Sequence, residues 1–183
     1  MRRTTLVLLG LVAPAMLLGS AARAAPSQLY GKSVVVAWTE EREQRVNGEA
    51  TTRNVGRNGS FSVYLSSAGK PFSRMSYAFS NARGGLKHGK KDAVGGEGSS
   101  IHKVAFSGNT MSVGMGMSGG ARNVLVTFDG GFGGCSAQVL TGKESGAKSI
   151  RAKSMVNGND VEILSIKTGA ASCRIQDGNV FGE

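Results

Sequence analysis

Histidine, cysteine, proline and aromatic residues are all scarce in this chain of 183 residues, which has two His, two Cys, three Pro and 6% aromatics. With only His88 and His102 available, and no G-x-S-x-G motif, the sequence offers no Ser-His-Asp arrangement. The cysteines lack C-x-x-C spacing and have no His beside them, which argues against a zinc or redox pair. We therefore predict a protein that is not an enzyme and that needs no cofactor.

Acidic residues are also few: the chain has 12 Asp and Glu, compared with 22 Lys and Arg. The N-terminus carries Arg2 and Arg3, an apolar block over Leu6–Leu18 and the A-x-A sequence of residues 22–24, which is typical of a secretory signal peptide cleaved after Ala24. We expect residues 1–24 to be that signal peptide, residues 25–183 to form one β domain, and no transmembrane segment to remain after cleavage. The predicted location is periplasmic or secreted. Cleavage would remove three basic and no acidic residues, leaving a net charge of about +7, which favours anionic partners.

Glycine, in contrast, is abundant, with 28 residues, and alternation of apolar and small residues is clearest between residues 101 and 140. Period-two alternation bounded by Gly, Asn and Asp predicts an antiparallel meander with one buried face. The four expected strands are Ile101–Phe106, Met111–Met117, Asn123–Phe128 and Cys135–Leu140.

Similar patterns predict strands over most of the remaining chain. These are Lys32–Thr39, Thr51–Val55, Ser60–Ser66, Phe72–Phe79, Ile150–Val156, Val161–Thr168 and Cys173–Gln176. The Asn58-Gly59 dipeptide is typical of a hairpin turn between the second and third of them. The charged run Glu40–Arg45 is compatible with either a short helical turn or a solvated strand extension. The chain is therefore expected to be all-β, with about 8–10 short strands in an antiparallel sandwich or an up-and-down barrel.

The two cysteines of an exported protein are most simply explained as a disulfide between Cys135 and Cys173. Each lies at the start of a predicted strand. On the chain-entropy description, closing a loop of about 39 residues stabilises the fold by roughly 4 kcal/mol.

Residues 81–100 have no period of their own and combine glycines with four Lys or Arg side chains and one histidine. A loop of about 20 residues inside a compact domain is unusual and indicates either function or disorder. The candidate binding residues are Arg83, Lys87, His88, Lys90 and Lys91. Closely spaced cations suit an anionic polysaccharide, lipid head groups or another protein. A second Gly/Lys-rich loop over Thr141–Lys153 would act with them. Specific nucleic-acid binding is not expected, because no aromatic residue is interleaved for base stacking.

Three methionines, Met111, Met115 and Met117, share one face of a predicted strand. Thioethers are soft ligands that suit Cu(I), and His102 on the neighbouring strand could add an imidazole. The alternative interpretation is that the methionines fill an irregular core. A dry core would bury the sulfurs, whereas a copper site would leave them open to solvent at a strand end.

Overall fold

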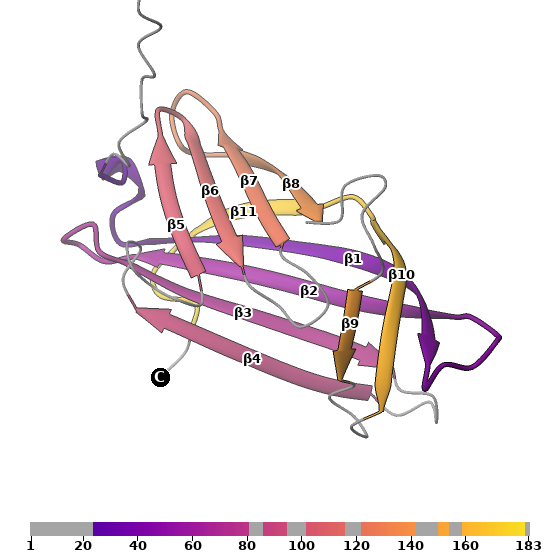
Figure 1. Cartoon of the computed structure of the whole chain (residues 1–183). Helices are drawn as coiled ribbons and strands as arrows, with labels where there is room; N and C mark the ends of the chain where they lie inside the picture. Colours follow the sequence, from indigo (N-terminus) through magenta and orange to yellow (C-terminus); the bar gives the residue numbers. More distant parts are fainter. Residues whose placement is uncertain are drawn as a thin grey trace, which may run out of the picture.

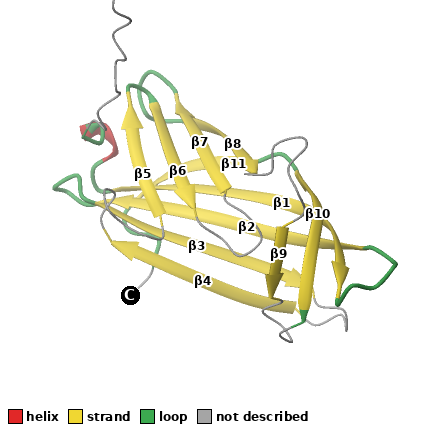
Figure 2. Ribbon diagram, viewed as in Figure 1, coloured by secondary structure: helices red, strands yellow, loops and turns green. Residues whose placement is uncertain are grey.

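Two antiparallel sheets make up the protein in the computed structural model, which describes residues 24–80, 86–94, 102–115, 122–141, 150–153 and 159–181 (Figures 1 and 2). Helical structure in these ranges is limited to the single turn η1 (Ser27–Leu29). None of the described residues belongs to a helix long and apolar enough to cross a membrane. Residues 1–23 of the expected signal peptide lie outside the described ranges.

The larger sheet has seven strands, six of them in the order β4-β3-β2-β1-β10-β9. The seventh, β11, pairs with the first part of β1, on the same edge of β1 that pairs with β10 further along. Its strands are β1 (Lys32–Val46), β2 (Arg53–Leu65), β3 (Pro71–Ser80), β4 (Leu86–Val94), β9 (Ile150–Lys153), β10 (Asp160–Thr168) and β11 (Ser172–Asp177). The smaller sheet has four strands, β5 (His102–Ser107), β6 (Thr110–Met115), β7 (Arg122–Phe128) and β8 (Cys135–Thr141), in chain order. The all-β prediction is confirmed, with eleven strands among the described residues rather than 8–10.

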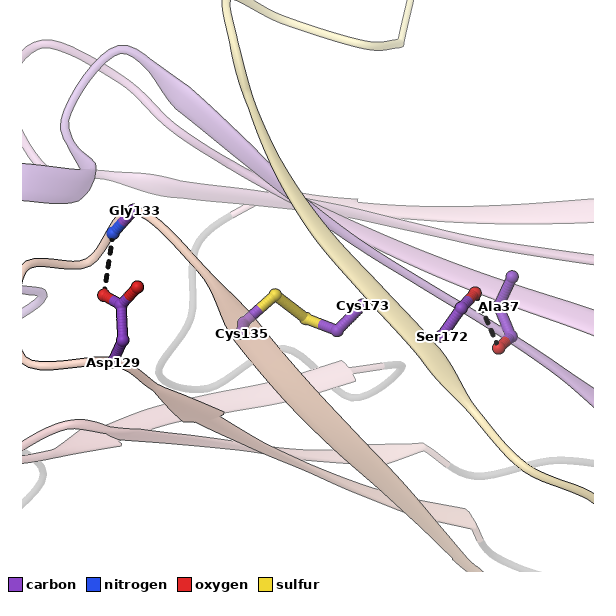
Figure 3. Close-up of a disulfide and its surroundings, with 6 residues drawn as sticks. All are labelled: Ala37, Asp129, Gly133, Cys135, Ser172 and Cys173. Carbon is purple, nitrogen blue, oxygen red and sulfur yellow. Dashed lines mark hydrogen bonds between the residues drawn. A yellow bond between two sulfur atoms is a disulfide. The ribbon is translucent and has the colours of Figure 1, made fainter.

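The smaller sheet is the meander predicted from the sequence. Alternate residues of β6 and β7 are buried along their lengths, as the period-two pattern requires. Gly108 takes a positive φ of 57° in the turn between β5 and β6. The turn after β7 is held by Asp129, whose Oδ1 accepts hydrogen bonds from the backbone N–H groups of Gly131 and Gly133. Figure 3 shows the bond from Gly133. Turn chemistry and alternation thus agree with the observed register.

The charged run after Thr39 continues as a strand, which decides between the two interpretations of Glu40–Arg45. Strand β1 extends to Val46, paired with β2 on one side and with β10 on the other. Its alternation persists through the charges, with Glu40 and Arg42 buried and Glu41 exposed. Pairing on both sides satisfies the backbone groups, so the segment has no need of helical hydrogen bonds.

The predicted hairpin at Asn58-Gly59 is wrong, because both residues lie inside the continuous strand β2. Gly59 is the register partner of Trp38 on β1. A Cβ atom at position 59 would overlap the indole ring of Trp38, so this glycine lets the ring lie flat against the strand. The glycine serves packing rather than a turn.

The expected loop over residues 81–100 contains a strand. Residues Leu86–Val94 form β4, which pairs with β3 from Ser80↔Leu86 to Phe72↔Val94. Strand β4 stands at one end of the order of the larger sheet. Charged residues are common on such edge strands because they discourage pairing with other chains, and this composition resembles that of a loop.

One core is shared by the two sheets. It combines Val34, Val36, Phe61 and Val63 of the larger sheet with Val104, Val113, Val124 and Val126 of the smaller one. Thr168 of β10 adds a hydrogen bond of 3.2 Å to the carbonyl of Val139 on β8. The predicted disulfide is confirmed: it joins Cys135 of β8 to Cys173 of β11 with a Cα–Cα distance of 5.6 Å, and so links the sheets covalently (Figure 3).

Candidate binding surface on the seven-stranded sheet

The face of the larger sheet that turns away from the smaller sheet carries an open trough with a volume of about 800 Å³. Along β1, Val36 and Trp38 are buried in the core, whereas Ala37 and Thr39 are exposed. Since side chains alternate across a strand, the exposed positions define the outer face. We call this feature the outer trough; its side chains come from β1, β2, β3, β4 and β11 and from residue Ala170.

Small side chains, both polar and apolar, form the floor of the outer trough. They stand in two rows that cross the strands, and the first row follows the pairings Ser172↔Ala37, Ala37↔Ser60 and Ser60↔Ser76. The second row follows Thr39↔Asn58, Asn58↔Ala78 and Ala78↔His88. Each row therefore combines hydroxyl or amide groups with one alanine methyl group, and His88, at the end of the second row, is the largest side chain in either of them.

Basic side chains border this floor. The His88 side chain of β4 is exposed and lines the outer trough. Arg74 lies two residues before Ser76 on the same face of β3 and donates a hydrogen bond of 2.7 Å to the carbonyl of Phe181. Its guanidinium also lies over the Phe181 ring, 4.9 Å from the centroid. The C-terminal segment therefore holds this arginine in place next to the trough.

The predicted basic site is only partly within the described residues. Lys87, His88, Lys90 and Lys91 all belong to β4, opposite Phe79, Ala78, Ser76 and Met75 in the register. Arg83 lies outside the described residues, as does most of the second predicted loop. The register thus places Lys90 beside Ser76 of the floor, which the sequence alone did not indicate.

A second polar feature is buried at the opposite face of the same strands. The Glu40 carboxylate is 4% exposed and accepts hydrogen bonds from two fully buried arginines, Arg42 of β1 and Arg122 of β7. The Arg122 Nε–Oε1 distance is 2.6 Å, and Trp38 Nε1 donates to the same oxygen at 3.1 Å. Because Arg122 belongs to the smaller sheet, this ion pair joins the two sheets in the core.

Burial and charge act in opposite directions on Glu40. Burial raises its pKa, but the hydrogen bond and charge of Arg122, followed by the charge of Arg42, lower the pKa to about 2. The pKa of Arg42 is lowered to about 10 by burial and then by the nearby charge of Arg57. Both groups stay ionised at neutral pH. A carboxylate with so low a pKa is a poor general base, so the arrangement suits a structural role better than proton transfer.

The methionines of the copper hypothesis lie in the core as far as they are described. Met111 is 0% and Met115 is 1% exposed, whereas Met117 lies outside the described residues. Four residues along a strand separate Cα atoms by about 13 Å, too far for Met111 and Met115 to bind one ion. His102 is the register partner of Met115, is itself buried, and shares a hydrogen bond of 2.8 Å with Ser73 through Nδ1. Copper binding stays a prediction.

No group of three or more His, Cys, Asp or Glu side chains that could hold a metal ion occurs within the described ranges. Comparison of the chain with protein-family models, with curated proteins and with solved structures found no match in any of the three. The chemistry of the outer trough is therefore the basis for a functional proposal.

Proposed function

We propose that this protein is an exported binding module that holds an anionic partner on the outer face of its larger sheet and performs no chemistry on it. The observation that supports this most directly is the position of β4. This strand contributes the exposed His88 to the outer trough and also carries Lys87, Lys90 and Lys91. A trough lined by both hydrogen-bonding and apolar groups, next to a strand rich in cations, is suited to a ligand that combines hydrogen-bonding groups with negative charge.

Charge over the whole chain supports the same proposal. The formal net charge of +10, or about +7 for residues 25–183 alone, attracts anionic surfaces and polymers over distances of about a Debye length. Among the described residues that line the outer trough there is no Asp or Glu. Partners of suitable chemistry are acidic polysaccharides, lipid head groups and acidic faces of other proteins. The disulfide is compatible with the oxidising environment of the periplasm or the extracellular space.

The test is retention on an anionic matrix over a series of salt concentrations. Replacement of Lys87, Lys90 and Lys91 by Ala removes three cations from β4, among which Lys90 lies opposite Ser76 of the floor in the register. Along β4 only Lys90 is in phase with the outward-facing His88, so the slope of log affinity against log salt should fall by about 1. Thermal unfolding of the variant should remain close to that of the unchanged protein.

A matched control removes the same charge elsewhere. Lys70, Lys103 and Lys167 are exposed and do not line the outer trough, so their replacement by Ala lowers the net charge equally. We expect this control to retain most of the binding. Equal losses in the two triple variants would show that net charge alone governs retention, and the proposed surface would then be wrong.

A further inference from the structure

The geometry points to a linear acidic polysaccharide as the ligand of the outer trough, laid across the strands so that successive sugars meet successive strands. This inference rests on the proposed function and specifies the class of partner. It distinguishes a saccharide from an acidic peptide and from a lipid surface, all three of which would carry the negative charge that β4 attracts.

The repeat of the floor is the first argument. Neighbouring strands lie about 4.8 Å apart, so the five strands from β11 to β4 span about 19 Å. A pyranose residue in an extended chain advances by a similar length. An oligosaccharide lying across the strands would therefore present its hydroxyl groups in step with the rows of the floor.

Unused hydrogen-bonding capacity is the second argument. The side chains of Asn58, Ser60 and Ser76 make no hydrogen bond to any other part of the chain that the structure describes. Each hydroxyl can donate one hydrogen bond and accept two, and the amide can both donate and accept. Sugar hydroxyls have the same dual character, whereas an acyl chain would leave these groups unpaired.

Backbone pairing is the third argument, and it weighs against a peptide. Peptides that bind sheets in an extended form usually add to an exposed edge, where free backbone groups pair with them. The floor lies instead on the face of paired strands, where β1 is bonded to both β2 and β11, and β2 to both β1 and β3. A peptide placed there would gain side-chain contacts alone.

The basic side chains around the floor favour an acidic saccharide over a neutral one. His88 lies at the β4 end of the second row, and Arg74 lies beside the first row on β3. At the opposite end, Arg174 of β11 is exposed and lies two residues beyond Ser172. Carboxylate or sulfate groups of the polymer would face the guanidinium groups of Arg74 and Arg174, while its hydroxyls face the floor. Glu41, the next outward residue of β1 after Thr39, is not among the residues that line the trough.

The experiment fills the trough without altering its charge. Ser60→Tyr places a large side chain on the floor between β1 and β3, and Ser112→Tyr, on an exposed position of β6, is the matched control. The probes are size-fractionated heparin oligosaccharides, dextran, poly-glutamate and phosphatidylglycerol vesicles. We expect Ser60→Tyr to weaken heparin binding at least tenfold, with no change in its retention on a sulfonated resin and no effect of Ser112→Tyr. Affinity should rise with oligosaccharide length up to about four or five sugars and then level off, since the floor spans five strands.

A second variant with smaller substitutions keeps the test valid if Ser60→Tyr does not fold. The double substitution of Ser60 and Ser76 by Ala removes two hydroxyls and should weaken heparin binding three- to tenfold while the melting temperature stays unchanged. If Ser60→Tyr or the double alanine variant binds heparin as well as the unchanged protein, the trough is not the saccharide site. Equal or tighter binding of poly-glutamate or of the vesicles, lost in Ser60→Tyr, would replace the saccharide by that partner. If the unchanged protein binds none of the anionic probes, the proposed function itself fails.

Discussion

Substitution of Glu40 by Gln is the sharpest test of the core, because it removes one charge and leaves the shape of the side chain almost unchanged. Arg42 and Arg122 are 1% and 0% exposed and would then have lost the carboxylate that neutralises them. Removal of one partner of a buried ion pair costs about 3–5 kcal/mol. The pKa gives a similar figure: a fall from 4.5 to about 2 corresponds to about 3 kcal/mol of stability at neutral pH.

The pH dependence has a definite sign. The folded-state pKa of Glu40 lies below the value in the unfolded chain, so its contribution is complete above about pH 4.5 and disappears as the pH falls towards 2. The amide side chain of the Glu40→Gln variant does not titrate. The difference in stability between the two proteins should therefore shrink from about 3 kcal/mol at pH 7 to near zero around pH 2.

Urea denaturation followed by tryptophan fluorescence is a suitable assay, because Trp38 is the only tryptophan and is buried beside Glu40. The matched control is Glu162→Gln, which removes the partly exposed pair with Arg45 and should cost about 1 kcal/mol or less. If Glu40→Gln is no more costly than Glu162→Gln at pH 7, the buried charges do not stabilise the contact between the sheets in the way described above.

Three further predictions concern other parts of the molecule. Replacement of Cys135 and Cys173 by Ser should cost about 4 kcal/mol in urea denaturation, and the unchanged protein should approach that value under reductant, whereas insensitivity to reductant would contradict a stabilising bridge. Gly59→Ala should cost about 1–3 kcal/mol because the new Cβ overlaps Trp38, while Gly56→Ala, with open space around it, should be neutral or stabilising; equal effects would refute the packing role of Gly59. Titration with Cu(I) tests the copper hypothesis: a site at Met115 requires a lower stoichiometry in Met115→Leu, and an unchanged stoichiometry removes that hypothesis.

Those parts of the fold that depend on local chemistry could be predicted from the sequence. The meander from β5 to β8 combines alternation with turns at Gly108 and Asp129, and both signals act over a few residues. The disulfide followed from the small number of cysteines. These features need no knowledge of which distant strands are neighbours.

Features that depend on pairing between distant strands escaped prediction. Gly59 looks like a turn residue until β1 is known to bring Trp38 against it. Glu40 and Arg42 look like a solvated run, because their burial depends on Arg122, which is 82 residues away from Glu40 in the chain. Glu40 and Arg42 continue the period-two phase of the apolar residues Val36 and Trp38, and this continuation is the sequence signal that could have predicted their burial.

The outer trough could not be predicted from the sequence either, because it too depends on the pairing of distant strands. Its floor consists of the outward positions of several strands, such as Ala37, Ser60 and Ser76, each of which is an ordinary outward-facing residue. Only the register shows that they line up in a row. Likewise, the sequence of β4 resembles a loop because five of its nine residues are charged or histidine, although its backbone pairs with β3 over the whole strand.

The most direct test of an anion-binding outer face is the affinity for a heparin oligosaccharide, measured by calorimetry over a range of salt concentrations. We predict that log affinity falls linearly with log salt, and that replacement of Lys87, Lys90 and Lys91 by Ala lowers the slope by about 1, through Lys90, while the Lys70, Lys103 and Lys167 variant leaves it unchanged. Affinity that is independent of salt, or an identical slope in the two triple variants, would contradict anion binding at this face.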